Sequence, residues 1–187
     1  MRIVGGRFRG QSLMAPEGRA TRPTADRVRE TVFNIIEHAH GGCQDRRVLD
    51  LFAGSGALGL EAYSRGAHRV LFVETAASAR AAIRHNIESL DALGATRIFK
   101  RDATDLGPLP PGKGGPFDLV FLDPPYGESL AMRALATAVA GGWLAPEALV
   151  LVEERAGETT HAEGFRVLDE RRFGDTAVSF LSRKGAA

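Results

Sequence analysis

The chain has 187 residues, of which 24 are basic and 23 acidic, so its formal net charge is +1. This length corresponds to one globular domain, or to one domain with a small appendage, and is sufficient for a core without disulfides. The single cysteine excludes an internal disulfide, and no apolar run approaches the roughly 18 residues of a membrane span or forms a secretory signal. We therefore expect a cytoplasmic protein. Taken alone, the near-zero charge argues against nucleic acid as a partner.

The basic residues, however, are concentrated at the N-terminus. Residues 1–29 contain seven arginines against Glu17 and Asp26, a charge of +5, whereas residues 30–187 contain 17 basic and 21 acidic residues, a charge of −4. Guanidinium groups match phosphate oxygens and stack on bases. The N-terminus is therefore either a nucleic-acid contact or a solvated, flexible segment, and charge alone does not distinguish the two.

Within this segment, residues 2–8 and 11–14 are predicted to form two short strands of a hairpin around Arg9 and Gly10. Pro23 favours an extended approach, and Thr24 can cap a following helix. The apolar face of that helix is predicted to contain Val28, Val32, Ile35 and Ile36.

From Arg47 onward, short apolar runs alternate with helical patterns. Strands are predicted at residues 48–52, 70–74, 98–100, 119–122 and 149–152. Continuously apolar strands separated by helices indicate an α/β fold with a parallel sheet covered on both faces. Residues 165–168 and 177–181 follow each other without a helix between them, so they are predicted to add an antiparallel edge.

A glycine-rich motif follows the first of these strands. Residues 54–59, Gly-Ser-Gly-Ala-Leu-Gly, lie between a strand and a helix, and Glu74 follows the next strand, twenty residues after Gly54. Glycines permit close backbone approach to a ligand, and an acidic side chain at this position can accept hydrogen bonds from ribose hydroxyls. The motif therefore predicts a nucleoside ligand.

Asp50 bears on which nucleoside binds. A dinucleotide places its pyrophosphate at the helix N-terminus, where an extra anion is unfavourable. S-adenosylmethionine has an ammonium and a sulfonium group and no phosphate, so Asp50 favours this cofactor, although the same side chain could simply cap the turn. A nicotinamide-dependent oxidoreductase stays the alternative.

A second motif, Asp123-Pro124-Pro125-Tyr126, follows the strand at residues 119–122. The prolines remove two N–H donors and leave carbonyl oxygens beside one carboxylate. Such acceptors can hold both N–H bonds of an exocyclic amine on a nucleobase, and Tyr126 offers a ring on which a base taken out of its stack can lie. This pattern predicts methylation of an amino group on a base.

Residues 50–56 together with residues 123–126 resemble S-adenosylmethionine-dependent amino-group methyltransferases. Residues 2–10, 22–34 and 173–176 narrow the resemblance to the RsmD family of 16S rRNA guanine-N2 methyltransferases, over nearly the whole chain. The resemblance implies a Rossmann-like class I methyltransferase fold with a seven-stranded, mostly parallel sheet. It also implies that the substrate is the N2 amine of guanine 966 in 16S rRNA, within a small ribosomal subunit or an assembly intermediate.

The resemblance assigns roles to individual residues. Residues 1–40 are expected to be an arginine-rich RNA-docking extension and residues 41–187 the cofactor-binding domain. Catalysis is assigned to Asp123, Pro124, Pro125 and Tyr126. The cofactor-binding residues are expected to be Asp50, Phe52, Gly54, Ser55 and Gly56 near the methionine end, Glu74 at the ribose, and Asp102 and Ala103 near adenine. RNA contacts are expected from Arg7, Arg9, Arg22, Arg27 and Arg29.

Several alternatives stay open. The motif at residues 123–126 also occurs in adenine-N6 and cytosine-N4 methyltransferases acting on DNA or other RNA, and a non-catalytic RNA-binding module would need only the N-terminal arginines. Residues 107–114 resemble the sequence pattern of a phosphate-binding loop, but three of them are prolines, which have no N–H group to donate to a phosphate. His38, His40 and Cys43 lack a fourth ligand nearby, so we expect no metal site. The loop at residues 106–115 shows no family signature.

Overall fold

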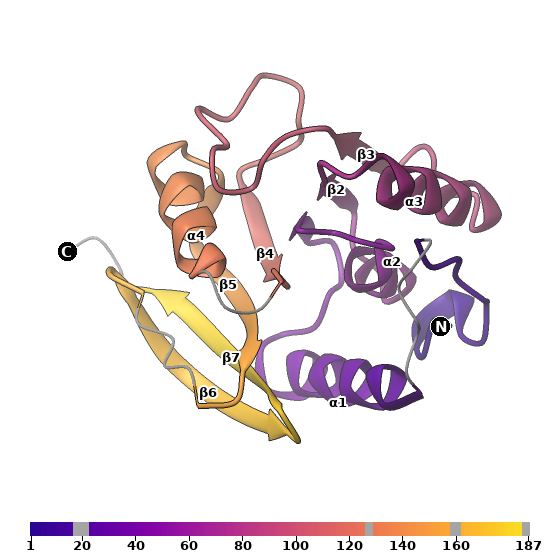
Figure 1. Cartoon of the computed structure of the whole chain (residues 1–187), viewed down its shortest axis with the longest axis horizontal. Coiled ribbons are helices and arrows are strands. Elements are labelled where there is room, and N and C mark those ends of the chain that lie inside the picture. The colour runs from indigo at the N-terminus through magenta and orange to yellow at the C-terminus, as the bar shows by residue number, and fades with distance from the viewer. Residues whose placement is uncertain (17–22, 126–128, 158–161, 185–187) are drawn as a thin grey trace.

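A seven-stranded mixed sheet runs through the centre of the molecule (Figure 1). The computed structural model describes residues 1–16, 23–125, 129–157 and 162–184. The strands are β1 (Arg47–Leu51), β2 (Arg69–Val73), β3 (Thr96–Phe99), β4 (Phe117–Leu122), β5 (Leu144–Arg155), β6 (Phe165–Phe173) and β7 (Thr176–Arg183). Their spatial order is β3-β2-β1-β4-β5-β7-β6. The first five are parallel, and β7 pairs antiparallel with both β5 and β6, which confirms the predicted α/β sheet with its antiparallel edge.

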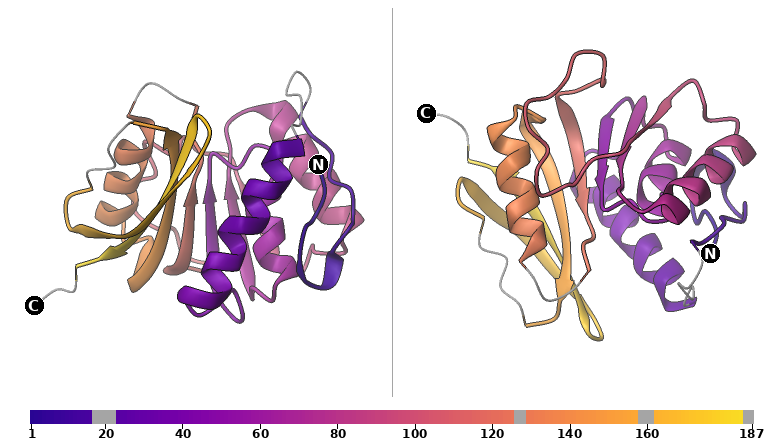
Figure 2. Two further views of the ribbon diagram at one scale, coloured as in Figure 1. Left: turned by 90° about the horizontal axis from the view of Figure 1, so that it is seen from below. Right: turned by 45° about the horizontal axis from the view of Figure 1, so that its top comes forward.

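Helices cover both faces of this sheet. They are α1 (Pro23–Ala39), α2 (Ala57–Ser64), α3 (Ala77–Ser89) and α4 (Leu130–Ala140). Apolar side chains of α1, α2 and α3 belong to one hydrophobic cluster with one face of the sheet, whereas those of α4 belong to a second cluster with the other face. In both views of Figure 2, α4 accordingly lies apart from the other three helices.

The alternation of strand side chains explains why the sequence has continuous apolar runs. In β1, Val48 faces the cluster that contains α2, and Leu49 and Leu51 face the cluster that contains α4. Because successive side chains of a strand point to opposite faces and both faces are covered, every residue of β1 after Arg47 is buried. Asp50 is also buried, although it is the one acidic residue of this strand.

The N-terminal segment differs from the predicted hairpin. Its two arms are joined by one antiparallel bridge, Arg2–Ser12, and residues 6–8 form a 3₁₀ turn in place of a strand. The reason is close contact with the end of α2: Gly6 has φ +73°, and a Cβ there would lie 2.1 Å from the Ser64 carbonyl oxygen. An extended strand cannot adopt this conformation. The Phe8 N–H donates to the Ser64 hydroxyl oxygen and not to a carbonyl of an opposing strand.

This N-terminal segment shares its core with the rest of the chain. Ile3 and Leu13 are buried in the cluster that also contains Phe33 and Ile36 of α1 and Phe72 of β2. Phe33, which the predicted apolar face omitted, is fully buried, and its ring centroid lies 5.5 Å from that of Phe121. The domain boundary at residue 40 stays a prediction, since the two parts pack into one hydrophobic cluster.

None of the helices in the described residues has the length and apolar character needed to cross a membrane.

Gly59 is the position at which α2 approaches β2 most closely. A Cβ at this residue would lie 2.4 Å from Cε1 of Phe72 and 2.7 Å from Cγ1 of Val70. We expect Gly59→Ala to lower the free energy of unfolding by about 1–3 kcal/mol, because the added methyl group overfills a closed interface. Urea denaturation measures this change. The control Gly94→Ala, with nothing within 4 Å of the added Cβ, should stay within about 0.5 kcal/mol of the parent protein, and equal effects would contradict the assignment.

Candidate active site

Three acidic side chains are positioned by the carboxyl ends of neighbouring parallel strands. Leu51, the last residue of β1, is in register with Val73 of β2 and with Leu122 of β4. Glu74 and Asp123 directly follow these partner strands. Open parallel sheets bind their ligands at this edge, so the sheet brings together the predicted residues of both sequence motifs.

Asp50 is the innermost of the three. Its side chain is buried, with 1% exposed, and Oδ2 accepts a hydrogen bond from the Gly59 N–H at 2.9 Å. Burial raises the pKa of Asp50 well above its usual value; the Gly59 bond opposes this shift, and the nearby charges of Asp123 and Glu74 add to it. Asp50 therefore caps the N-terminus of α2, which is the alternative that the sequence left open.

The glycine-rich turn is held by Glu74. Gly54 and Gly56 have φ +58° and +77°, conformations that favour glycine. Glu74 Oε2 accepts a hydrogen bond from the Gly54 N–H at 2.9 Å, and its Oε1 accepts one from the Ala76 N–H at 2.8 Å. The carboxylate predicted to bind ribose thus also fixes the turn against the end of β2.

Phe52 enters the same turn with φ +60°. A bulky residue in this left-handed region is strained by about 1–3 kcal/mol, and such strain persists where the surrounding structure imposes it. Its side chain packs partly buried against the cluster on the α4 face. The predicted cofactor residue Phe52 therefore begins the change of direction from β1 into the turn.

Asp102 and Ala103 follow β3, the strand next to β2. Asp102 Oδ1 accepts hydrogen bonds from both the N–H and the hydroxyl of Thr104, each at 2.8 Å, and these bonds lower the pKa of the exposed Asp102 carboxyl. Ala103 is buried, and its carbonyl accepts the Thr137 hydroxyl at 3.2 Å. This segment has a fixed backbone at the same edge of the sheet as Glu74.

The second motif follows β4. Pro124 is buried and Pro125 is exposed, and the charge of Asp123 reaches Asp50 strongly enough to affect its pKa. Tyr126 lies outside the described residues. The structure therefore brings the Asp123 carboxylate and the glycine-rich turn to one site, as predicted.

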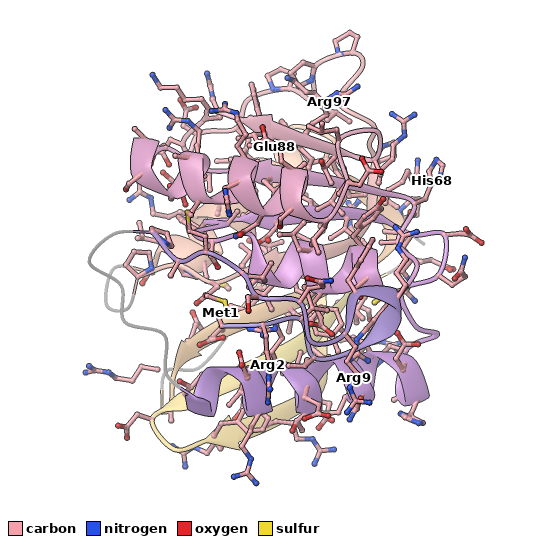
Figure 3. The ribbon with its side chains drawn as sticks, turned by 90° about the vertical axis from the view of Figure 1, so that its right-hand side faces the viewer. Met1, Arg2, Arg9, His68, Glu88 and Arg97 are labelled. Carbon is pink, nitrogen blue, oxygen red and sulfur yellow. The ribbon has the colours of Figure 1, made fainter. Side chains whose placement is uncertain are left out.

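The predicted RNA-binding arginines do not all face solvent. Arg7, Arg9 and Arg27 are exposed, and Arg9 lies on the face that Figure 3 presents. Arg22 lies outside the described residues. Arg29 is only 6% exposed, so its assignment as an RNA contact is wrong for this structure. Its guanidinium binds Asp26 at 2.9 Å and the Arg2 carbonyl, and it lies 3.6 Å from Glu61.

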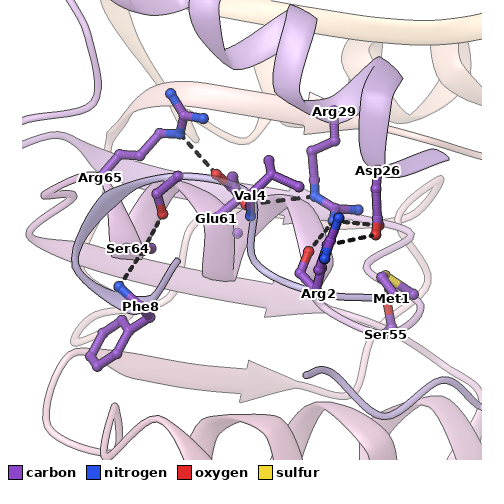
Figure 4. A network of polar contacts seen from close by, with 12 residues as sticks. Met1, Arg2, Val4, Phe8, Asp26, Arg29, Ser55, Glu61, Ser64 and Arg65 are labelled. Carbon is purple, nitrogen blue, oxygen red and sulfur yellow. Dashed lines mark hydrogen bonds and ion pairs between the residues drawn. The ribbon is translucent and has the colours of Figure 1, made fainter. Parts of the chain in front are cut away.

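Sequence reasoning missed Glu61, the centre of this network (Figure 4). Glu61 is fully buried in α2 and accepts hydrogen bonds from the Val4 N–H at 2.8 Å and from Arg65 Nε at 2.8 Å. A buried carboxylate requires such partners, and the removal of any one leaves an uncompensated group. A single charged residue within the apolar sequence of α2 was the signal that could have indicated this role.

Arg7 is held differently from Arg29. Its guanidinium carbon lies 4.8 Å from the centroid of the Phe8 ring and 4.1 Å from that of Tyr63, and these two rings stack at 5.9 Å. Cation–π contact of this kind orients a guanidinium without neutralising its charge. Arg7 therefore presents a fixed positive charge at the surface.

Within the described residues, no group of three or more His, Cys, Asp and Glu side chains is arranged to hold a metal ion.

The strand order, the glycine-rich turn after β1 and the acidic residue after β2 define a class I methyltransferase fold. A solved structure, that of the candidate methyltransferase yhhF from Escherichia coli, matches with a TM-score of 0.82 and 34% identity over 100% of this chain and 99% of that chain.

The family follows from sequence comparison. The family model described as Conserved hypothetical protein 95 matches residues 1–182. Ribosomal RNA small subunit methyltransferase D of Escherichia coli (strain K12) is 40% identical over 186 residues, which cover 98% of this chain and 90% of that protein. The protein of the same name from Haemophilus influenzae is 34% identical over 93% of this chain and 89% of its own length. The chain belongs to the RsmD family.

The buried Asp50 makes a prediction about pH. Because the pKa of Asp50 is raised in the folded state, its contribution to stability is full below the ordinary carboxyl pKa of about 4 and is lost as the pH rises toward the raised value. We expect the free energy of unfolding of Asp50→Asn, measured in urea, to improve relative to the parent protein as the pH is raised above about 4.

Asp118 provides a control of opposite sign. Hydrogen bonding to the Arg47 guanidinium at 2.9 Å and 3.0 Å holds the pKa of Asp118 below its usual value. Its stabilising contribution is therefore present above the ordinary carboxyl pKa and is lost as the pH falls. Asp118→Asn should therefore lose stability relative to the parent protein as the pH rises toward about 4 and keep a constant deficit above it, and parallel pH profiles for both variants would contradict the two assignments.

Proposed function

We propose that this chain transfers a methyl group from S-adenosylmethionine to the exocyclic N2 amine of a guanine in 16S rRNA. Membership of the RsmD family and the names of its relatives support an rRNA methyltransferase of the small subunit. The observation that carries the choice of cofactor is the occupation of the glycine-rich turn by two carboxylates.

Those carboxylates distinguish S-adenosylmethionine from a dinucleotide. Pyrophosphate binds to backbone N–H groups at such a turn. In this chain the Gly54 N–H donates to Glu74 and the Gly59 N–H donates to Asp50, so two backbone donors are already bonded to carboxyl groups of the protein. A phosphate would find these donors already bonded, whereas S-adenosylmethionine has no phosphate and needs neither of them. The nicotinamide-dependent alternative is therefore disfavoured.

The residues that would hold this cofactor lie on adjacent elements. Glu74 would bind the ribose hydroxyls, because a carboxylate has about four acceptor positions and can keep its backbone bonds. Gly54 and Gly56 leave room for the methionine portion, and residues 102–103 would border the adenine. When bound, S-adenosylmethionine supplies an electrophilic methyl group.

The chemical work of the protein is positioning. The Asp123 carboxylate and the Pro124 carbonyl oxygen would accept the two N–H bonds of the guanine amine and direct its lone pair toward the methyl group. Methylation makes that nitrogen acidic, and Asp123 would then accept its proton. The pyrrolidine rings fix the backbone that carries these acceptors.

RNA binding is proposed for the exposed arginines Arg7, Arg9 and Arg27. Contacts of this type neutralise phosphates and release counterions, so the affinity should fall steeply with salt. The substrate is proposed to be the rRNA within a small ribosomal subunit or an assembly intermediate. The reaction is proposed to need no metal ion.

The decisive experiment incubates the protein with methyl-labelled S-adenosylmethionine and, separately, with purified 16S rRNA and with small subunits from cells that lack the modification. We expect label in N2-methylguanine of at least one of the two substrates, identified by nuclease digestion and mass spectrometry. Label in N6-methyladenine or N4-methylcytosine would overturn the guanine assignment, and absence of transfer to every substrate would overturn the enzymatic function.

Asp123→Ala tests the role of the second motif. We expect kcat to fall by about 10²–10⁴, because both an acceptor for the amine and the proton acceptor are removed. The affinity for S-adenosylhomocysteine, measured by calorimetry, should change little. Asp118→Asn is the matched control, since Asp118 lies at the other end of β4 and pairs with Arg47. Full turnover by Asp123→Ala would refute the assignment.

A further inference from the structure

Asn86 joins two parts of the chain to which different ligands are assigned. It lies in α3 with no exposed side-chain surface. Its Oδ1 accepts a hydrogen bond from the Met14 N–H at 2.7 Å, and its Nδ2 donates to the Met14 carbonyl at 2.9 Å and to the Ser55 carbonyl at 3.0 Å. One amide group therefore binds the N-terminal segment from both sides and also binds the glycine-rich turn.

A second contact links the same two parts. The Ser55 hydroxyl lies 3.5 Å from Sδ of Met1, and the Leu13 N–H donates to the Met1 carbonyl at 2.9 Å. The first arm thus contacts Ser55 directly through Met1, and the second arm is linked to it through Asn86. Ser55 stands between the two glycines with positive φ. A shift of either arm changes the surroundings of the turn.

At Met14 the N-terminal segment is held by hydrogen bonds of its backbone and not by burial of the Met14 side chain. The Met14 side chain is 47% exposed, whereas its backbone N–H and carbonyl are both bonded to a buried amide. Separation of the two parts would leave buried polar groups without partners, which is costly. The turn and the segment therefore have one favoured relative position.

We propose that Asn86 is a positioning residue that couples cofactor binding to RNA binding. This inference rests on the proposed function, in which the turn at residues 54–56 binds S-adenosylmethionine and the N-terminal arginines bind rRNA. A ligand that fixes the turn also fixes the Ser55 carbonyl and, through Asn86, the backbone of Met14. Coupling of two sites is reciprocal, so each ligand strengthens the binding of the other by the same factor.

The test measures this factor directly. The dissociation constant of S-adenosylhomocysteine is determined for the protein alone and for the protein saturated with unmodified small ribosomal subunits. For the parent protein we expect the subunits to tighten binding by about fivefold or more. For Asn86→Ala we expect the ratio of the two dissociation constants, without and with subunits, to fall to near one. The turnover of this variant, measured at saturation with both ligands, should fall by a smaller factor than this ratio does.

Ser64→Ala is the matched control. The Ser64 hydroxyl also holds the N-terminal segment, with bonds to the Phe8 N–H at 3.0 Å and the Gly5 carbonyl at 2.6 Å, but it belongs to the far end of α2. We expect this variant to keep the coupling. An equal loss of coupling in both variants would overturn the assignment to Asn86, because it would show that any loosening of the segment has the same effect.

A measurement on the unmodified protein avoids dependence on the folding of a variant. Hydrogen exchange of peptides that contain residues 13–16 is recorded with and without S-adenosylhomocysteine, in the absence of RNA. We expect the amide of Met14 to exchange more slowly when S-adenosylhomocysteine is bound. Binding of S-adenosylhomocysteine with no change at Met14 would overturn the coupling and leave the proposed function standing, whereas no binding at all would overturn the proposed function.

Discussion

Helix α2 can lie against β2 only because residue 59 has no side chain. The Cε1 atom of Phe72 and the Cγ1 atom of Val70 occupy the space that a Cβ would need, and the Gly59 N–H is directed at the buried Asp50. This close contact fixes the start of α2 and therefore the turn that precedes it. It also fixes the two α2 side chains, Glu61 and Ser64, on which the N-terminal segment is anchored.

Glu61 makes the N-terminal segment a structural part of the molecule. A carboxylate without solvent contact is costly, and here the compensation comes from both sides of the interface, with Arg65 in the same helix and Arg29 and the Val4 N–H from the N-terminal part. Without the N-terminal part, Glu61 would keep only one of these partners. The buried charges that hold the segment in place, on Glu61 and Arg29, are thus separate from the arginine charges that it exposes to solvent.

The sequence predicted the sheet well because its strands are buried on both faces, so that a run such as residues 119–122 has one plausible structure. The convergence of Glu74 and Asp123 was likewise predictable, since parallel strands end at the same edge. Two features were not. Arg29 lies on the buried face of its helix, three, four and seven residues before Val32, Phe33 and Ile36, but arginine is mostly exposed in proteins, so its residue type gave no sign of burial against Glu61. The 3₁₀ turn at residues 6–8 depends on the distant Ser64, which no local pattern reveals.

The carboxylates bonded to the glycine-rich turn have a consequence for selectivity inside a cell. The proposed cofactor shares its adenosine with ATP and with nicotinamide dinucleotides, so recognition of adenine and ribose alone cannot separate these ligands. Discrimination requires an element that disfavours the competitors. Asp50 and Glu74 fit that requirement, because their carboxyl groups are bonded to backbone donors that a phosphate chain would need. With the proposed cofactor, the bonds that stabilise the turn are therefore also the bonds that would disfavour phosphorylated competitors.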